Sequence, residues 1–257
     1  MDVKREKHEV RMRVYRALEA SGVALPPKPI AGRIPNFKGA AAAARRLAGQ
    51  GELIKARVVF CNPDSPQRPL RELLLRRGKT LVMATPRLAR GFILLTPGMA
   101  AGRYRLASTI RGAFKVGRLI QLDELPQVDV KVTGSVAVTE RGDRLGKGHG
   151  YSELEYAILR EVGAVSEETP VATTVHDLQV VEHIPAEPHD ITVDLIATPI
   201  RLIEARGEVR RPKGVMWELL DERYLNEIPV LMELRKRAAH PEAARKLPSS
   251  TRHSHSG

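Results

Sequence analysis

The chain has 257 residues, of which 42% are hydrophobic and 28% charged, and these proportions are typical of a folded protein rather than a disordered one. Its 42 basic and 30 acidic residues give a net charge of +12, which favours negatively charged partners such as nucleotides or nucleic acid. Because only 4% of the residues are aromatic and base stacking needs aromatic side chains, an ordinary basic surface explains the charge equally well. The single cysteine, Cys61, excludes an internal disulfide framework and a zinc site built from cysteines.

The sequence gives no sign of a membrane or export segment. No apolar run approaches the roughly 20 residues that cross a bilayer, and residues 1–15 lack the apolar segment of a signal peptide. We therefore expect a cytoplasmic protein that does not span a membrane.

The N-terminal part predicts two helices separated by an irregular stretch. Residues 3–20 place apolar side chains on one helical stripe and basic side chains, among them Lys7 and Arg11, on another. Residues 25–40 are rich in proline and glycine and predict no long regular element. The run of small residues at 41–50 predicts the second helix.

The middle of the chain alternates between strands and helices. Apolar runs predict strands at residues 56–61, 79–85, 117–122, 128–139, 169–176 and 190–199. Helical patterns lie at 68–78, closed by Gly78, and at 152–163. Strands separated by crossover helices predict an α/β fold with a mainly parallel sheet, in which ligands bind at the carboxyl ends of the strands.

The strand signal fades after residue 212. One further helix is expected at about 228–239, and the Ser-, His- and Arg-containing end predicts a disordered tail. We accordingly divide the chain into an α/β domain at 1–212, a helical extension at 213–240 and a tail at 241–257.

The stretch RLGKGHGY, residues 144–151, suggests an anion site. Glycines at alternate positions let backbone N–H groups approach an anion, and a helix that begins near Tyr151 adds the positive end of its dipole. Side-chain charge comes from Arg144, Lys147 and His149. The spacing matches neither the P-loop nor the dinucleotide-binding pattern, so the residues alone leave a phosphate site and a structural turn equally open.

The longer string GSVAVTERGDRLGKGHGY resembles the ATP-binding loop of the 5-formyltetrahydrofolate cyclo-ligase family, whose Arg-Leu-Gly-x-Gly-x-Gly-Tyr pattern residues 144–151 match. KHEVR, with Lys7 and Arg11 one helical turn apart, resembles the family's N-terminal Lys-x-x-x-Arg. A divergent branch, the methenyltetrahydrofolate synthetase domain-containing proteins, is similar in five ordered segments: RIPNFKGA, TPRLARG, RLGKGHGYSELEYA, GAVSEETPV and HDITVD. The resemblance implies a three-layer α/β/α sandwich of the cyclo-ligase type.

The resemblance also implies an activity. A cyclo-ligase converts 5-formyltetrahydrofolate, or here a related pterin, to the 5,10-methenyl form and releases ADP and phosphate, with ATP and Mg²⁺ as cofactors. It implies that ATP is bound by Lys7, Arg11, Gly146, Lys147, Gly148, His149, Gly150 and Tyr151. The residues expected in catalysis are Arg144, Lys147 and Tyr151. Asp190 and Glu153 are the candidate magnesium ligands, and for Asp190 the capping of a turn is equally open.

Several positions depart from the family pattern, mainly on the folate side. Ser152, Glu153 and Leu154 replace the usual Tyr-Asp-Arg after the loop. Where cyclo-ligases offer a carboxylate to the pterin, only Asp64 is present, and the family's Phe-Gly-Ile-x-Glu-Pro stretch has no counterpart. The alternative function is therefore a non-catalytic protein that kept the fold and binds a nucleotide, or RNA through its basic surface.

Overall fold

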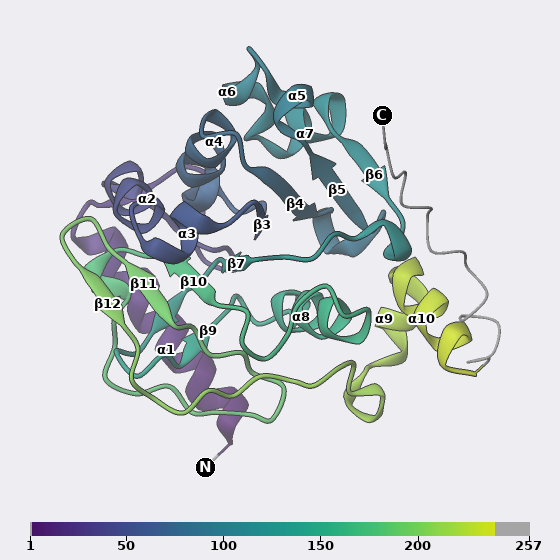
Figure 1. Ribbon diagram of the computed structural model, residues 1–257. Coiled ribbons are helices and arrows are strands. Elements are labelled where there is room, and N and C mark those ends of the chain that lie inside the picture. Colours follow the sequence, from purple (N-terminus) through teal and green to yellow (C-terminus); the bar gives the residue numbers. More distant parts are fainter. Residues whose placement is uncertain (1, 240–257) are drawn as a thin grey trace.

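The computed structural model describes residues 2–239, and its centre is an eight-stranded sheet with helices on both faces (Figure 1). The strand order is β12-β11-β10-β7-β3-β4-β5-β6. Neighbours from β11 to β4 pair in parallel, whereas β12, β5 and β6 pair antiparallel at the two edges. The strands are β3 (Val58–Cys61), β4 (Thr80–Ala84), β5 (Phe92–Leu95), β6 (Arg118–Ile120), β7 (Val130–Thr133), β10 (Val171–Thr174), β11 (Leu195–Ala197) and β12 (Leu202–Glu204).

Helices cover both faces of this sheet, which confirms the predicted α/β class. On β3, Val59 and Cys61 face one core while Phe60 faces the other, because successive side chains of a strand point to opposite faces. One layer contains α2 (Ala40–Ala48), α3 (Gly51–Lys55), α4 (Arg68–Arg76), α5 (Pro97–Ala100), α6 (Tyr104–Ala107) and α7 (Ile110–Val116). The other contains α8 (Tyr151–Glu161) and α10 (Pro229–Ala239).

Helix α1 (Val3–Ala20) packs against a small ribbon instead of the large sheet. The ribbon pairs β8 (Ala137–Val138) with β9 (Arg144–Leu145) in antiparallel orientation. Apolar residues of α1, among them Val10, Val14 and Leu18, are buried against Ala137 and Leu145. The helix thus lies against the base of the loop that begins at Gly146.

Some segments differ from the sequence expectation. Residues 25–40 contain two two-residue strands, β1 (Ala24–Leu25) and β2 (Asn36–Phe37), which pair antiparallel. The strand expected at 128–139 is interrupted after Thr133, where the chain passes Asp64 so closely that a Cβ on Gly134 would lie 2.6 Å from Asp64 Oδ2.

The structure also contains elements that the sequence patterns do not predict, namely strand β5 and helices α5–α7. Short 3-10 turns lie at Ser65–Gln67 (η1), Pro86–Leu88 (η2), Leu122–Glu124 (η3) and Asp177–Gln179 (η4).

The C-terminal extension shares the core of the α/β domain. It comprises η5 (Trp217–Leu219), α9 (Glu222–Glu227) and α10, close to the helix expected at 228–239. Val215, Ile228 and Leu231 are buried in the same cluster as the apolar side chains of α8. A domain boundary at residue 212 stays a prediction, and the expected tail at 241–257 lies outside the described residues.

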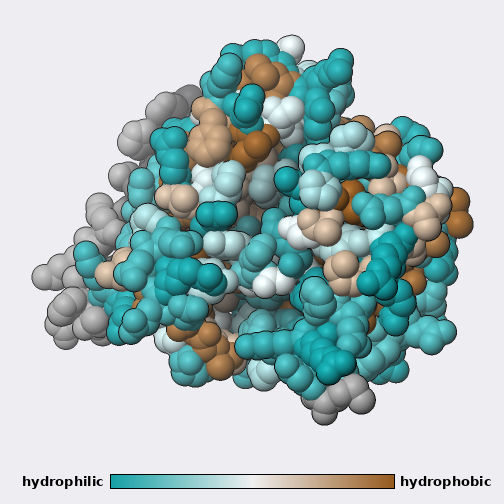
Figure 2. Space-filling model, turned by 180° about the vertical axis from the view of Figure 1, so that it is seen from behind, coloured by the Kyte–Doolittle hydropathy of each residue, from teal (hydrophilic) through white to brown (hydrophobic). Residues whose placement is uncertain are grey.

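The helices and the surface of the described residues are largely polar. Among residues 2–239, each helix is too short or too polar to cross a bilayer. The face seen in Figure 2 is mostly hydrophilic, and its hydrophobic residues lie in small separate groups.

Candidate functional site

The glycine loop lies at the carboxyl ends of two central parallel strands. Asn62, directly after β3, donates from Nδ2 to Ser152 Oγ at 3.1 Å. Thr133, the last residue of β7, shares a 3.1 Å hydrogen bond with the same oxygen. Since Ser152 is in the first turn of α8, the loop that precedes this helix is held above the ends of β3 and β7, where ligands of parallel sheets bind.

The loop backbone has the conformation that its glycines permit. Gly148 has φ +99° and Gly150, the N-cap of α8, has φ +66°, values that side-chain-bearing residues rarely adopt. Arg11 Nε donates to the carbonyl of Gly146 at 2.7 Å. In the part of the chain that the structure describes, the backbone N–H groups of residues 146–150 donate no hydrogen bond. These N–H groups and the N-terminus of α8 can therefore receive an anion.

A pocket lies on each side of the loop. The larger, of about 620 Å³, is lined by Lys7 and Arg11 of α1, by residues 187–190 and by part of the extension. The smaller, of about 420 Å³, is lined by polar side chains that include Asn62, Asp64 and Lys147. Both pockets share Gly146, Gly148, His149, Gly150 and Glu153. The loop is thus a partition between two cavities of a size that holds small molecules.

Lys7 connects α1 to an acidic turn in the larger pocket. Its buried Nζ lies 2.7 Å from Glu187 Oε2 and 2.6 Å from Asp190 Oδ2. Asp190 Oδ2 also accepts from the backbone N–H of Glu187 at 2.7 Å, so this carboxylate caps a turn and faces the site at the same time. The ligand atoms of Glu187, His189 and Asp190 all lie within 4.8 Å of one another, which is close enough to share a metal ion.

Arg144 and Glu153 are bound to each other. The guanidinium of Arg144 is buried, forms an ion pair with Glu153 and donates to the carbonyl of Gly134 from Nε at 3.1 Å and from Nη2 at 2.6 Å. Burial alone would raise the pKa of Glu153, but the neighbouring Arg144 lowers it, and the net pKa lies below its ordinary value. The pair fastens the base of the loop to α8. The catalytic role of Arg144 and the metal-binding role of Glu153 stay predictions.

The remaining loop side chains reach the pockets. Lys147 Nζ is 3.5 Å from Asp64 Oδ1 in the smaller pocket. His149 borders both pockets, and its partial desolvation there, together with the positive charges of Lys147 and Arg87, lowers its pKa. Tyr151 lines the smaller pocket and meets the ring of Tyr224 edge-on, with ring centroids 5.6 Å apart.

Sequence reasoning missed a buried polar cluster beneath the smaller pocket. Lys131, on β7, is completely buried, and its Nζ lies 3.7 Å from Glu155 Oε2 and 3.3 Å from Asn62 Oδ1. Asn62 Nδ2 in turn donates to Glu155 at 2.8 Å. Burial lowers the pKa of Lys131 and raises that of Glu155, while each charge opposes the shift of the other. The signal that the sequence offers is a lysine within the otherwise uncharged strand VKVT.

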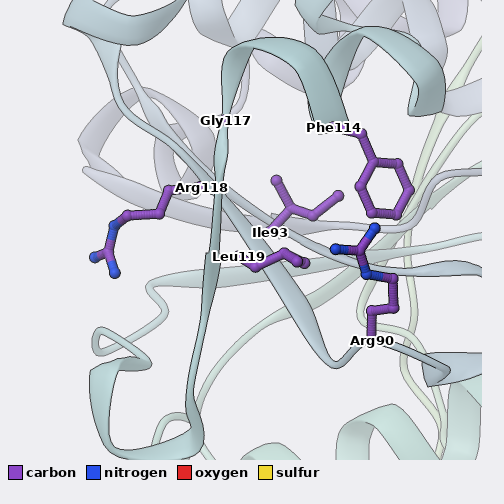
Figure 3. Close-up of a pocket in the computed structure, with 6 residues that line it drawn as sticks. All are labelled: Arg90, Ile93, Phe114, Gly117, Arg118 and Leu119. Carbon is purple, nitrogen blue, oxygen red and sulfur yellow. The ribbon is translucent and has the colours of Figure 1, made fainter.

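A further hollow of about 460 Å³ lies at the edge of the sheet (Figure 3). Apolar atoms of Ile93, Leu119 and Phe114 line it, together with two arginines. The guanidinium of Arg90 lies over the ring of Phe114, 5.4 Å from its centroid, whereas Arg118 points to the other side (Figure 3). None of the expected site residues lines this hollow.

Known proteins resemble this chain along most of its length. A methenyltetrahydrofolate synthase domain-containing protein of Mus musculus is 44% identical over 237 residues, which are 90% of this chain and 63% of the relative. The Homo sapiens protein of the same name is 40% identical, with coverage of 90% and 62%. The chain thus spans about three fifths of the length of these curated relatives.

A solved structure shares the fold. The NMR structure of Aquifex aeolicus 5,10-methenyltetrahydrofolate synthetase matches with a TM-score of 0.51 at 20% identity, covering 83% of this chain and 99% of that one. The sequence model of the 5-formyltetrahydrofolate cyclo-ligase family matches residues 3–199, which include α1, the glycine loop and the acidic turn. From this match we conclude that the chain belongs to the 5-formyltetrahydrofolate cyclo-ligase family.

Proposed function

We propose that the protein is an ATP-dependent cyclo-ligase that converts 5-formyltetrahydrofolate, or a related pterin, to its 5,10-methenyl form. The observation that carries this proposal is the glycine loop with one pocket on each side, in a chain that belongs to the cyclo-ligase family. A reaction between two bound molecules needs their reacting groups held close together. The loop between the two pockets is thin, because glycine leaves it without a side chain at three positions. Ligands in the two pockets can therefore approach each other across it.

The larger pocket is the proposed ATP site. Lys7 and Arg11 bring positive charge from α1, and the N–H groups of residues 146–150 and the N-terminus of α8 suit phosphate oxygens. The smaller pocket is the proposed pterin site. Asn62 and Asp64 offer an amide and a carboxylate there, which are groups that can hydrogen-bond to the amino and ring nitrogens of a pterin.

The proposed reaction begins with transfer of the γ-phosphoryl group of ATP to the formyl oxygen, and ADP leaves. The nitrogen at position 10 then attacks the formyl carbon and gives up its proton, and the bond from carbon to the phosphorylated oxygen breaks to release inorganic phosphate, which carries that proton away as HPO₄²⁻. Phosphoryl transfer requires positioning and compensation of negative charge. We assign charge compensation to Lys147, orientation of the ligand beside the loop to Tyr151, and stiffening of the loop base to Arg144 through Glu153.

The donor set of the larger pocket fits a magnesium ion. Magnesium is held by one or two carboxylates together with phosphate oxygens, and Asp190 and Glu187 offer two carboxylates close together. We propose that these two residues hold the ion, with Glu153 as a further candidate whose carboxylate Arg144 already engages. When bound, magnesium supplies positive charge to the phosphates. Lys7, which lies between the two carboxylates, offsets part of their negative charge.

A second pocket also argues against the alternative. A protein that only bound a nucleotide or RNA would need no cavity for a small molecule on the far side of the loop, and the family match supports the enzyme instead.

The test is an absorbance time course that follows the methenyl chromophore with purified protein, MgATP and 5-formyltetrahydrofolate. We expect product only when ATP is present, and Lys147→Ala should lower kcat about 100-fold, as does the loss of one group that stabilises transition-state charge. Lys115→Ala, on the exposed surface of α7, is the matched control and should leave kcat unchanged. A wild-type protein that binds both ligands and forms no methenyl product would refute the proposed activity.

A further inference from the structure

The larger pocket is completed by residues outside the family match. That match ends at residue 199, yet the pocket wall includes Met216, Leu219, Leu220 and Tyr224 of the C-terminal extension. The extension therefore contributes to the cavity that α1 and the glycine loop begin.

The wall of this pocket has two chemically different parts. One part is charged and comes from α1 and the turn at 187–190. The other is apolar and comes from Leu154 and Ala157, one turn apart on α8, and from the extension. In Figure 1, α1 lies to the left of α8 and the segment leading to α9 lies to its right. A nucleoside triphosphate has the same division, with a charged triphosphate at one end and a flat, largely apolar base at the other.

The extension is attached to the loop as well as to the core. Tyr224 Oη donates to the carbonyl of His149 at 2.6 Å, and its ring packs edge-on against Tyr151. On either side of the wall, Val215 and Ile228 are buried in the main core. The apolar wall is thus fixed on both sides and held next to the loop.

We infer that residues 216–224 form the base-binding wall of the nucleotide pocket. Met216, Leu219 and Leu220 contact the nucleobase, and Tyr224 is a positioning residue that fixes the loop through the carbonyl of His149. The inference rests on the proposed function, because it takes a nucleoside triphosphate as the occupant of the larger pocket.

The test separates contacts to the base from contacts to the phosphates. Dissociation constants are measured for MgATP and for magnesium tripolyphosphate, which has the phosphates without the nucleoside.

Leu219 is 55% exposed and Met232, on the outer side of α10, is 42% exposed, so serine at either position leaves the core intact. Leu219→Ser should raise the Kd of MgATP about three- to tenfold, as expected for the loss of one apolar contact. It should leave the Kd of tripolyphosphate within about twofold, and Met232→Ser should change neither value.

The outcomes distinguish this inference from the proposed function. An unchanged MgATP affinity in Leu219→Ser, or an equal loss for both ligands, would overturn the base-binding wall while leaving the phosphate site in place. A wild-type protein that binds neither ligand would overturn the proposed function and the inference with it.

Tyr224→Phe provides a second measurement, since it keeps the aromatic ring and removes only the hydroxyl donor. Because Tyr224 acts through the loop, this variant should weaken MgATP and tripolyphosphate by the same factor, about threefold for one lost hydrogen bond, while the protein stays fully folded at the assay temperature. A lower Tm with both affinities unchanged would mean that Tyr224 has only a structural role.

Discussion

Lys131 places its amino group in the middle of the sheet, where no part of its side chain reaches solvent. It is held by Glu155 and Asn62 and by the face of the Phe60 ring, whose centroid is 4.4 Å from Nζ. A buried ion pair adds little stability compared with apolar residues, because both charges lose their hydration. Removing only one partner is costly, because the other charge is left buried without compensation.

The first prediction therefore concerns this pair. Lys131→Met should lower the free energy of unfolding by ~3–5 kcal/mol, whereas the double variant Lys131→Met/Glu155→Leu should lose clearly less. Urea unfolding measures both. The exposed pair of Arg5 and Glu9 is the control, and Arg5→Met should cost less than ~1 kcal/mol. Equal losses in the single and double variants would mean that the two charges do not compensate each other.

The second prediction concerns the protonation of His149. Partial desolvation and the surrounding positive charges lower its pKa, which favours the neutral imidazole. The pKa in the folded state is below that in the unfolded state, so its contribution to stability is present above the unfolded pKa and is lost as the pH falls through the folded pKa. Phosphates bound beside the loop would favour the charged ring and raise the pKa.

A histidine NMR titration checks this directly. The free protein should show His149 titrating below about 6.5, and saturating MgATP should move its pKa upward, with His149→Asn used to assign the resonance. By linkage, the affinity for MgATP should then increase as the pH falls through the pKa of the bound state. A pKa that stays constant or decreases on addition of MgATP would show that no phosphate lies near the ring.

At the scale of elements, the sequence predicts best where one local pattern is sufficient. Strands β3 and β4 are short apolar runs with a helix between them, and α8 follows a glycine loop, so each was predicted close to its observed position. Strand β5 has the equally apolar run FILL. It runs antiparallel to its neighbour β4 near the sheet edge, so no crossover helix separates the two strands. The alternation of strand and helix that predicts the other strands is therefore missing at β5. The break at Gly134 depends on the approach of Asp64, 70 residues earlier in the chain, which no local pattern contains.

The candidate site shows the same limit. The motif at residues 144–151 and the basic residues of α1 could be found from sequence, because each is a short local pattern. Their actual partners could not be found, since the ion pair of Arg144 with Glu153 and the contact of Lys7 with Glu187 and Asp190 depend on how distant segments pack. Tyr224, 75 residues after His149, lies in a segment with no motif at all.

At the scale of the whole molecule, α1 and the extension converge on one loop. Arg11 holds the carbonyl of Gly146 and Tyr224 holds that of His149, so the loop is fastened by both segments. The extension also shares the main core, where Leu231 and Leu234 of α10 are buried beside the apolar side chains of α8. A loss of packing in α10 should therefore affect the entire fold.

The third prediction follows from this shared core. The chain contains one tryptophan, Trp217, which lies in the extension, so its fluorescence reports on the extension while far-ultraviolet circular dichroism reports on all helices and strands. If both belong to one cooperative unit, the two probes should give coincident urea transitions. Leu231→Ala should shift both transitions together by ~2–5 kcal/mol, as large-to-small changes in cores do, and the exposed Met232→Ala by less than ~0.5 kcal/mol. A fluorescence transition at lower urea than the dichroism transition would instead mean that the extension unfolds by itself, and the pocket wall that it supplies would then open without unfolding of the sheet.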